Sequence, residues 1–219
     1  MTADYEQAAL KATETLIRYN ITTAPVSPLP ILKSMPGILV LSFAELASKI
    51  GMDRQHVLCS FSSDNRDVVT SVTNVGGKLR YFVAYNQRLP FYMLQRAMAR
   101  EMGHIVLKHD GSRPEDVRQE EALIFARNLI CPRPLIKALM DEIKPLTIET
   151  LGNVTGCYER CLLGIRRTPG AHVPSELNRK VKEQFSDYIS NFLDCRQILT
   201  DNDITDEADF GIYMDNYEE

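Results

Sequence analysis

The chain has 219 residues, of which 44% are apolar and 25% are charged, and its net charge is −4 at pH 7. This apolar content is enough for a buried core and excludes an intrinsically disordered chain, and the lack of a basic excess makes nucleic acid an unlikely partner. The acidic N-terminal residues predict no signal peptide, and no apolar run approaches the roughly 20 residues of a membrane span. We therefore expect a cytoplasmic protein with no membrane partner.

The cysteines are odd in number and form no CxxC pair, which argues against both a disulfide framework and a zinc ribbon. Two of them lie four residues apart on a predicted helix and are interpreted as buried apolar side chains. The five are Cys59, Cys131, Cys157, Cys161 and Cys195. All are expected to be reduced.

The first predicted element is a helix. Apolar residues recur at helical spacing from Tyr5 to Leu16, and Thr2 or Asp4 precedes them as a capping residue. A proline-rich link over residues 25–30 follows. We expect this helix to pack as a cover on the rest of the fold.

A strand and a short helix follow the link. The apolar run at residues 38–41 predicts the strand. Ser42 and Glu45 have the spacing of a capping box, and Gly51 marks the end of the helix that this box begins.

Three further strands are predicted at residues 56–61, 68–73 and 79–85. The last two are joined by a turn in which Gly76 and Gly77 supply positive φ angles, so they form a hairpin. From Phe91 onward the pattern is helical. This order predicts an α+β fold with a small, mostly antiparallel sheet, followed by a C-terminal helical extension.

The extension carries an apolar stripe over residues 175–193 at spacings of four, four, three and four. We expect the stripe to be buried, either on the same chain or in a homodimer. Residues 201–219 are rich in acids and contain no Lys or Arg, which is typical of a solvated tail. The expected divisions are a domain at 1–167, the extension at 168–200 and the tail at 201–219.

The segment with the most chemical information runs from Arg100 to His104. It has the form of an HExxH motif in which arginine replaces the first histidine. In that motif, residues i and i+4 share one helix face and bind one zinc ion, while the glutamate at i+1 takes a proton from metal-bound water. Glu101 and His104 occupy the base and second-ligand positions. Arginine offers no lone pair to a metal, so Arg100 cannot replace the missing ligand.

A third ligand in such sites usually comes from a following helix. Ser112 and Glu115 have capping-box spacing and predict the start of a helix that runs to Pro132. Glu121 lies on the apolar face of this helix, whereas Glu120 points elsewhere. A carboxylate buried in this way needs a cation, which is either a metal ion or a guanidinium.

Together these segments are similar to the ImmA/IrrE family of metallo-endopeptidases. The resemblance rests on an extended segment that ends at Asn86, on the HExGH-like segment, and on the run from Glu121 to Pro132, in which Leu123 replaces the usual asparagine. It covers about residues 5–166. The resemblance implies a zincin-like fold and a zinc enzyme that cleaves a protein regulator, often a helix-turn-helix repressor of a mobile element. Glu101 would then be the general base.

The zinc ligands implied by the resemblance are His104 and Glu121. His109 is the one nearby residue that could complete the set. If nothing completes it, Arg100 fills the vacated ligand position by pairing with Glu121 or Glu101, and zinc is weakly bound or absent.

Three functions remain open from the sequence. The first is a degenerate metallopeptidase that binds a protein partner, and the second is an active zinc endopeptidase that cleaves the partner. The third is a DNA-binding regulator, because residues 146–167 resemble two helices joined by a turn at Gly152 and Asn153 and end in arginines. The second of these helices lacks a polar face for reading bases, which argues against this function.

Overall fold

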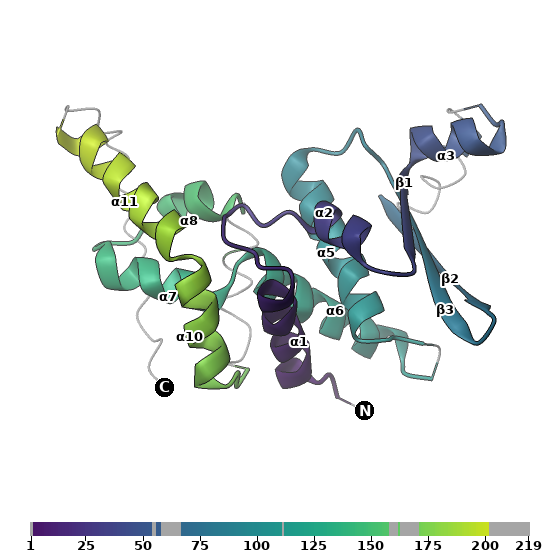
Figure 1. Ribbon diagram of the computed structural model, residues 1–219, viewed down its shortest axis with the longest axis horizontal. Coiled ribbons are helices and arrows are strands. Elements are labelled where there is room, and N and C mark those ends of the chain that lie inside the picture. Colours follow the sequence, from purple (N-terminus) through teal and green to yellow (C-terminus); the bar gives the residue numbers. More distant parts are fainter. Residues whose placement is uncertain are drawn as a thin grey trace. The chain divides into compact units, whose positions relative to one another are not determined.

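The computed structural model of the chain describes residues 2–53, 56–57, 67–110, 112–157, 162 and 171–201. These residues form helices and one small sheet, which confirms the predicted α+β class (Figure 1). The chain divides into two compact units. We call Met1–Asp4 with Ser27–Ala126 the sheet unit, and Tyr5–Val26 with Arg127–Glu219 the helical unit. Every candidate site residue lies in the sheet unit.

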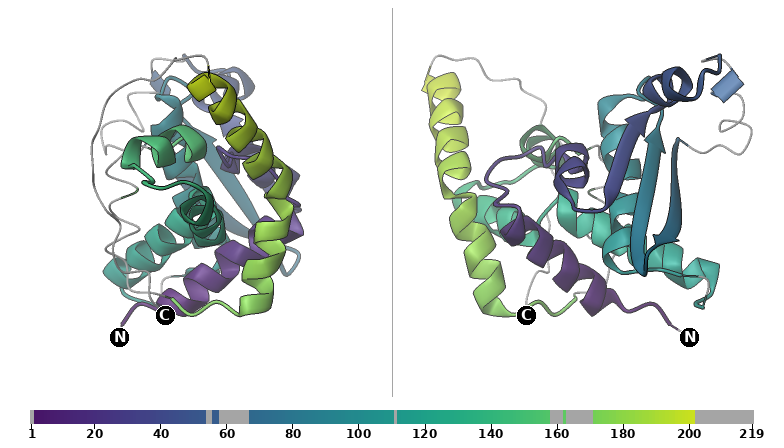
Figure 2. Two further views of the ribbon diagram at one scale, coloured as in Figure 1. Left: turned by 90° about the vertical axis from the view of Figure 1, so that its left-hand side faces the viewer. Right: turned by 45° about the vertical axis from the view of Figure 1, so that its right-hand side comes forward.

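The sheet has three strands in the order β1-β3-β2, with β1 at Ile38–Ser42, β2 at Val68–Val75 and β3 at Lys78–Tyr85 (Figure 2). The hairpin prediction is confirmed, because β2 and β3 pair in antiparallel register and their turn holds Gly76 and Gly77 at φ of 59° and 78°. Strand β1 pairs with β3 in parallel. The sheet is therefore mixed, with one antiparallel and one parallel pair.

Helix α3, Phe43–Ile50, follows β1 directly and begins as predicted. The Ser42 side chain accepts a hydrogen bond from the Glu45 amide, and the Glu45 carboxylate accepts one from the Ser42 amide. The helix ends at Gly51, which adopts the left-handed conformation. The strand predicted at 56–61 is wrong at its first two residues, which are helical, and its remaining residues lie outside the described part of the chain.

Helices α2, Pro28–Ser34, and α5, Phe91–Val106, pack together; α2 also contacts β1, and α5 contacts β2 and β3. Helix α6, Glu115–Ile130, packs closely on α5 at Gly103. A β-carbon added to Gly103 would lie 3.1 Å from both the Cα and the carbonyl oxygen of Ala122. The backbones of α5 and α6 therefore approach closely at this glycine, which brings the two site-bearing helices together.

Replacing Gly103 with valine should destabilise the sheet unit by about 1–3 kcal/mol, because the new side chain meets backbone that cannot rotate away. Chemical denaturation monitored by circular dichroism measures the change. Ala97→Val on the same helix is the matched control, since Ala97 is partly exposed and its replacement should cost well under half as much. Equal losses for the two variants would contradict the close packing at Gly103.

The helical unit contains α1 at Tyr5–Arg18, α7 at Arg133–Glu142, α8 at Ile148–Thr155, α10 at Ser175–Gln184 and α11 at Ser186–Asp201. Helix α10 packs against α1 and α7. The burial predicted for the stripe of residues 175–193 is confirmed in part: Val181 and Phe185 are fully buried, whereas Leu177, Tyr188 and Phe192 are only partly buried. The domain boundary expected after residue 167 lies inside this unit.

Two other predictions concern this unit. The turn predicted at Gly152 and Asn153 is wrong, because α8 continues through both residues and ends at Gly156, which has a φ of 67°. Most of the second helix of that predicted pair, and the acidic tail beyond residue 201, lie outside the described residues. Among the described helices, none combines the length and apolarity needed to cross a membrane.

Candidate functional site

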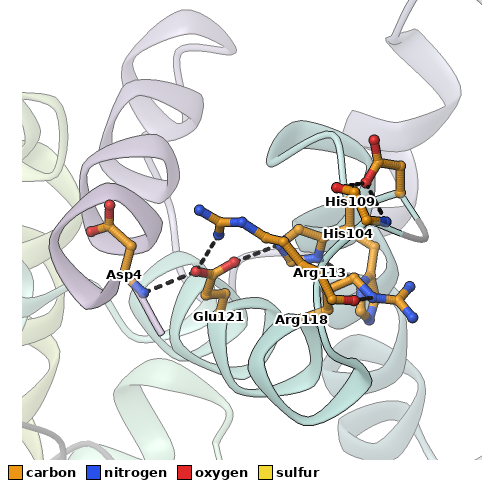
Figure 3. Close-up of polar contacts among 8 residues, drawn as sticks. Asp4, His104, His109, Arg113, Arg118 and Glu121 are labelled. Atoms are coloured by element: carbon orange, nitrogen blue, oxygen red, sulfur yellow. Dashed lines mark hydrogen bonds and ion pairs between the residues drawn. The ribbon is translucent and has the colours of Figure 1, made fainter. Parts of the chain in front are cut away.

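The site lies where α5, the loop after it and α6 meet (Figure 3). Helix α5 carries Arg100, Glu101 and His104, and α6 carries Glu121. The loop returns to α5 because Lys108 adopts a left-handed φ of 54°, and the amide of His109 then donates to the carbonyl of His104 at 2.9 Å. This local bend explains why the His109 side chain lies against His104.

Glu121 is the centre of the polar network, with only 2% of its surface exposed. Its Oε1 accepts hydrogen bonds from the Asp4 amide at 2.9 Å and from Arg113 Nη1 at 2.6 Å. Its Oε2 lies 2.9 Å from His109 Nε2 (Figure 3). Burial alone would raise the pKa of this carboxyl, but the hydrogen bonds from Asp4, Arg113 and His109 outweigh it and hold the pKa below its ordinary value. Glu121 is therefore ionised at neutral pH.

The ionised carboxylate fixes the tautomers of both histidines. Because Glu121 can only accept, the proton of a neutral His109 lies on Nε2, and its Nδ1 carries a lone pair. His109 Nδ1 lies 2.8 Å from His104 Nδ1, so His104 must donate from Nδ1. The result is a directed chain of hydrogen bonds from His104 through His109 to Glu121.

Both imidazoles are neutral at pH 7. Burial is the main cause that lowers the pKa of His104 to about 4, and the neighbouring His109 and Arg100 lower it further. Burial likewise lowers the pKa of His109, although its hydrogen bond to Glu121 offsets part of the effect. The side chain of His109 is only 3% exposed.

These shifts predict a loss of stability in mild acid. The unfolded chain binds a proton at His104 near pH 6.5, whereas the folded chain does not until the pH reaches about 4. Protonation therefore favours the unfolded state, so the free energy of unfolding should fall as the pH drops from 6.5 to 4, by about 2 kcal/mol for this partly exposed group. Urea denaturation at a series of pH values measures it.

The control for this pH dependence is the variant His104→Asn. It should reduce the slope between pH 6.5 and 4 and leave only the part that the lowered pKa of His109 contributes. A slope as steep as that of the wild type would assign the dependence to other groups.

Of the two partners predicted for Arg100, the structure confirms Glu101, and the ion pair predicted with Glu121 is wrong. The Arg100 guanidinium lies 3.6 Å from Glu101 Oε1, and the Arg100 side chain is 44% exposed. The guanidinium that neutralises Glu121 belongs to Arg113, in the loop before α6. The physical argument for a cation beside the buried carboxylate was sound, but it identified the wrong arginine.

Arg113 and the Asp4 amide are therefore the site groups that sequence reasoning missed. No spacing rule connects Arg113 to Glu121, because the residues between them include a loop. The capping box predicted at Ser112 and Glu115 also fails here. The Ser112 hydroxyl and amide donate to Asp110 Oδ1 instead, and the helix begins at Glu115.

A catalytic zinc ion, which the resemblance implies, does not fit this arrangement of residues. Both Glu121 oxygens already accept hydrogen bonds, and the His109 ring lies between His104 and Glu121. Arg100 holds the first ligand position with a positive charge. Within the described residues, no three His, Cys, Asp or Glu side chains are grouped to hold a metal ion.

Comparison with known proteins gives no further assignment. No protein-family model matches the chain. No curated protein and no solved structure matches it either.

Proposed function

We propose that this chain is a metal-independent regulatory protein of the zinc-metallopeptidase type, which binds a protein regulator without cleaving it. The partner class suggested by the ImmA/IrrE resemblance is a cytoplasmic helix-turn-helix repressor, such as that of a mobile element. The observation that carries the proposal is that both oxygens of Glu121 already have partners, since they accept from Arg113, the Asp4 amide and His109.

The chemistry of the site supports binding over hydrolysis. Catalytic zinc sites use three protein ligands and an open position for water. Here Arg100 cannot ligate, and Glu101, at the position of the general base, lies beside the Arg100 guanidinium. Without a metal ion to lower the pKa of a bound water, Glu101 would have to act on ordinary water, which is a far weaker nucleophile. The polar residues that remain in the site therefore stabilise the fold and do not form a catalytic centre.

A surface suited to a protein partner lies on the same helix. Phe91, Tyr92 and Met93, in the first turn of α5, are 57%, 43% and 40% exposed. Three adjacent exposed side chains of this size are typical of contact surfaces, where aromatic residues and methionine are enriched. The site and this surface lie on a single rigid element.

The experiment that tests the proposed function measures zinc content and repressor binding. For the first, the purified protein is dialysed against zinc and analysed for metal. For the second, it is mixed with purified helix-turn-helix repressors with and without chelator. We expect well under one zinc per chain, and binding of a repressor that is insensitive to chelator and leaves the repressor intact. Phe91→Ser should weaken the binding, whereas Val75→Ser, at an exposed apolar residue of the hairpin, should not.

Cleavage of a repressor would contradict the proposal if it is abolished by chelator and by Glu101→Gln. That result would favour the alternative function of an active zinc endopeptidase, with His109 or the substrate completing the metal site.

A further inference from the structure

The position of His109 has a consequence for metal binding that goes beyond the loss of the first ligand. Ligands of one zinc ion lie about 2.0–2.2 Å from it, so a histidine and a glutamate on the same ion approach each other closely. In this chain a whole imidazole separates them, since His109 contacts His104 through Nδ1 and Glu121 through Nε2. His104 and Glu121 are thus linked by a side chain where a metalloenzyme would link them by an ion.

We propose that His109 replaces the metal ion as the link between α5 and α6, and that it competes with zinc for His104 and Glu121. Arg100 and His109 then exclude zinc independently. Arg100 removes a ligand, and His109 holds Nδ1 of His104 and Oε2 of Glu121. This proposal rests on the metal-independent function proposed above and explains how the fold keeps its two helices joined without an ion.

Three features hold His109 in this role. The left-handed Lys108 and the amide hydrogen bond to the His104 carbonyl fix its backbone. Its side chain is almost completely buried, and both of its ring nitrogens have partners. A neutral imidazole that donates at one nitrogen and accepts at the other satisfies an ionised carboxylate and a neutral histidine at once.

A His109 that supported zinc binding instead of competing with it would give a different result. Histidines that ligate zinc usually donate their second nitrogen to a nearby acceptor, and loss of that acceptor weakens metal binding by about 10- to 100-fold. If His109 supported a metal in this way, or ligated it directly, its removal would lower zinc affinity. If His109 competes with the metal, its removal raises the affinity. The sign of the effect separates the two roles.

The test compares zinc binding by the full chain in four forms: wild type, Arg100→His, His109→Ala, and the double variant Arg100→His/His109→Ala. Arg100→His supplies the missing ligand one helical turn before His104. Zinc affinity is measured by competition with a chromophoric chelator, and thermal melting with and without EDTA gives a second readout. His172→Ala in the Arg100→His background is the matched control, because His172 is an exposed histidine outside the network.

We expect the double variant to bind about one zinc per chain at least tenfold more tightly than Arg100→His alone, and its melting temperature to fall in EDTA. Weaker binding by the double variant than by Arg100→His, or no zinc binding by either, would overturn the proposal. Zinc and peptidase activity in the wild type would instead refute the proposed function. Should His109→Ala fold poorly, His109→Leu fills the same space, and Glu121 keeps its bonds from Arg113 and the Asp4 amide.

Discussion

Replacing Glu121 with alanine should lower the free energy of unfolding by about 3–5 kcal/mol, the usual cost of removing one partner from a buried charged network. The change removes the acceptor for three donors, which are the Asp4 amide, Arg113 and the buried His109 side chain. Arg113 can turn to solvent, because its side chain is already 42% exposed. Urea denaturation at pH 7 measures the loss.

Arg100→Ala is the contrasting variant and should cost less than about 1 kcal/mol. Its ion pair with Glu101 is 3.6 Å long and its own side chain is 44% exposed, and long pairs whose cation is this exposed contribute little. If Arg100→Ala were as damaging as Glu121→Ala, Arg100 would be the cation that neutralises Glu121, and the pairing with Arg113 would be incorrect.

The second large effect is expected at Phe185, between α10 and α11. This side chain is fully buried in the helical unit, so Phe185→Ala should destabilise that unit by about 3–5 kcal/mol through lost burial and the cavity left behind. The neighbouring Tyr188 hydroxyl donates to the Val154 carbonyl at 2.7 Å, which ties α11 to α8. Thermal or urea unfolding of the variant tests the prediction.

Phe192→Ala on α11 is the matched control, because Phe192 is only partly buried and its removal should cost about 1 kcal/mol. A small effect of Phe185→Ala, comparable with this control, would mean that the stripe of residues 175–193 does not pack as the structure has it.

Local rules predicted much of this fold from the sequence. The capping box at Ser42, the hairpin at Gly76 and Gly77, and the burial of Glu121 each follow from spacing within one element. The strand at 38–41 was also predicted. Its parallel pairing with β3 was not, because the direction of pairing depends on the path of the chain between the two strands, which no local sequence pattern specifies. Pairing direction is a property of the tertiary fold.

In the candidate site, too, local rules predicted some features, while others depend on the tertiary fold. Helical periodicity predicted that Glu121 is buried and therefore needs a cation beside it. It could not show whether that cation is Arg100 or Arg113. Arg113 reaches Glu121 from a loop, and the Asp4 amide reaches it from a segment 117 positions away. The bridging position of His109 depends on the left-handed backbone at Lys108, a conformation that lysine rarely adopts and that its sequence context does not reveal.

The most direct test of the account is the tautomeric state of His104 and His109, measured by two-bond nitrogen–proton correlation spectra of the protein labelled with ¹⁵N-histidine at pH 7. We expect His109 to be protonated at Nε2 and His104 at Nδ1, and we expect chelator to change neither signal. Histidine signals that shift when EDTA is added, or a His109 protonated at Nδ1, would contradict a metal-free link from His104 through His109 to Glu121.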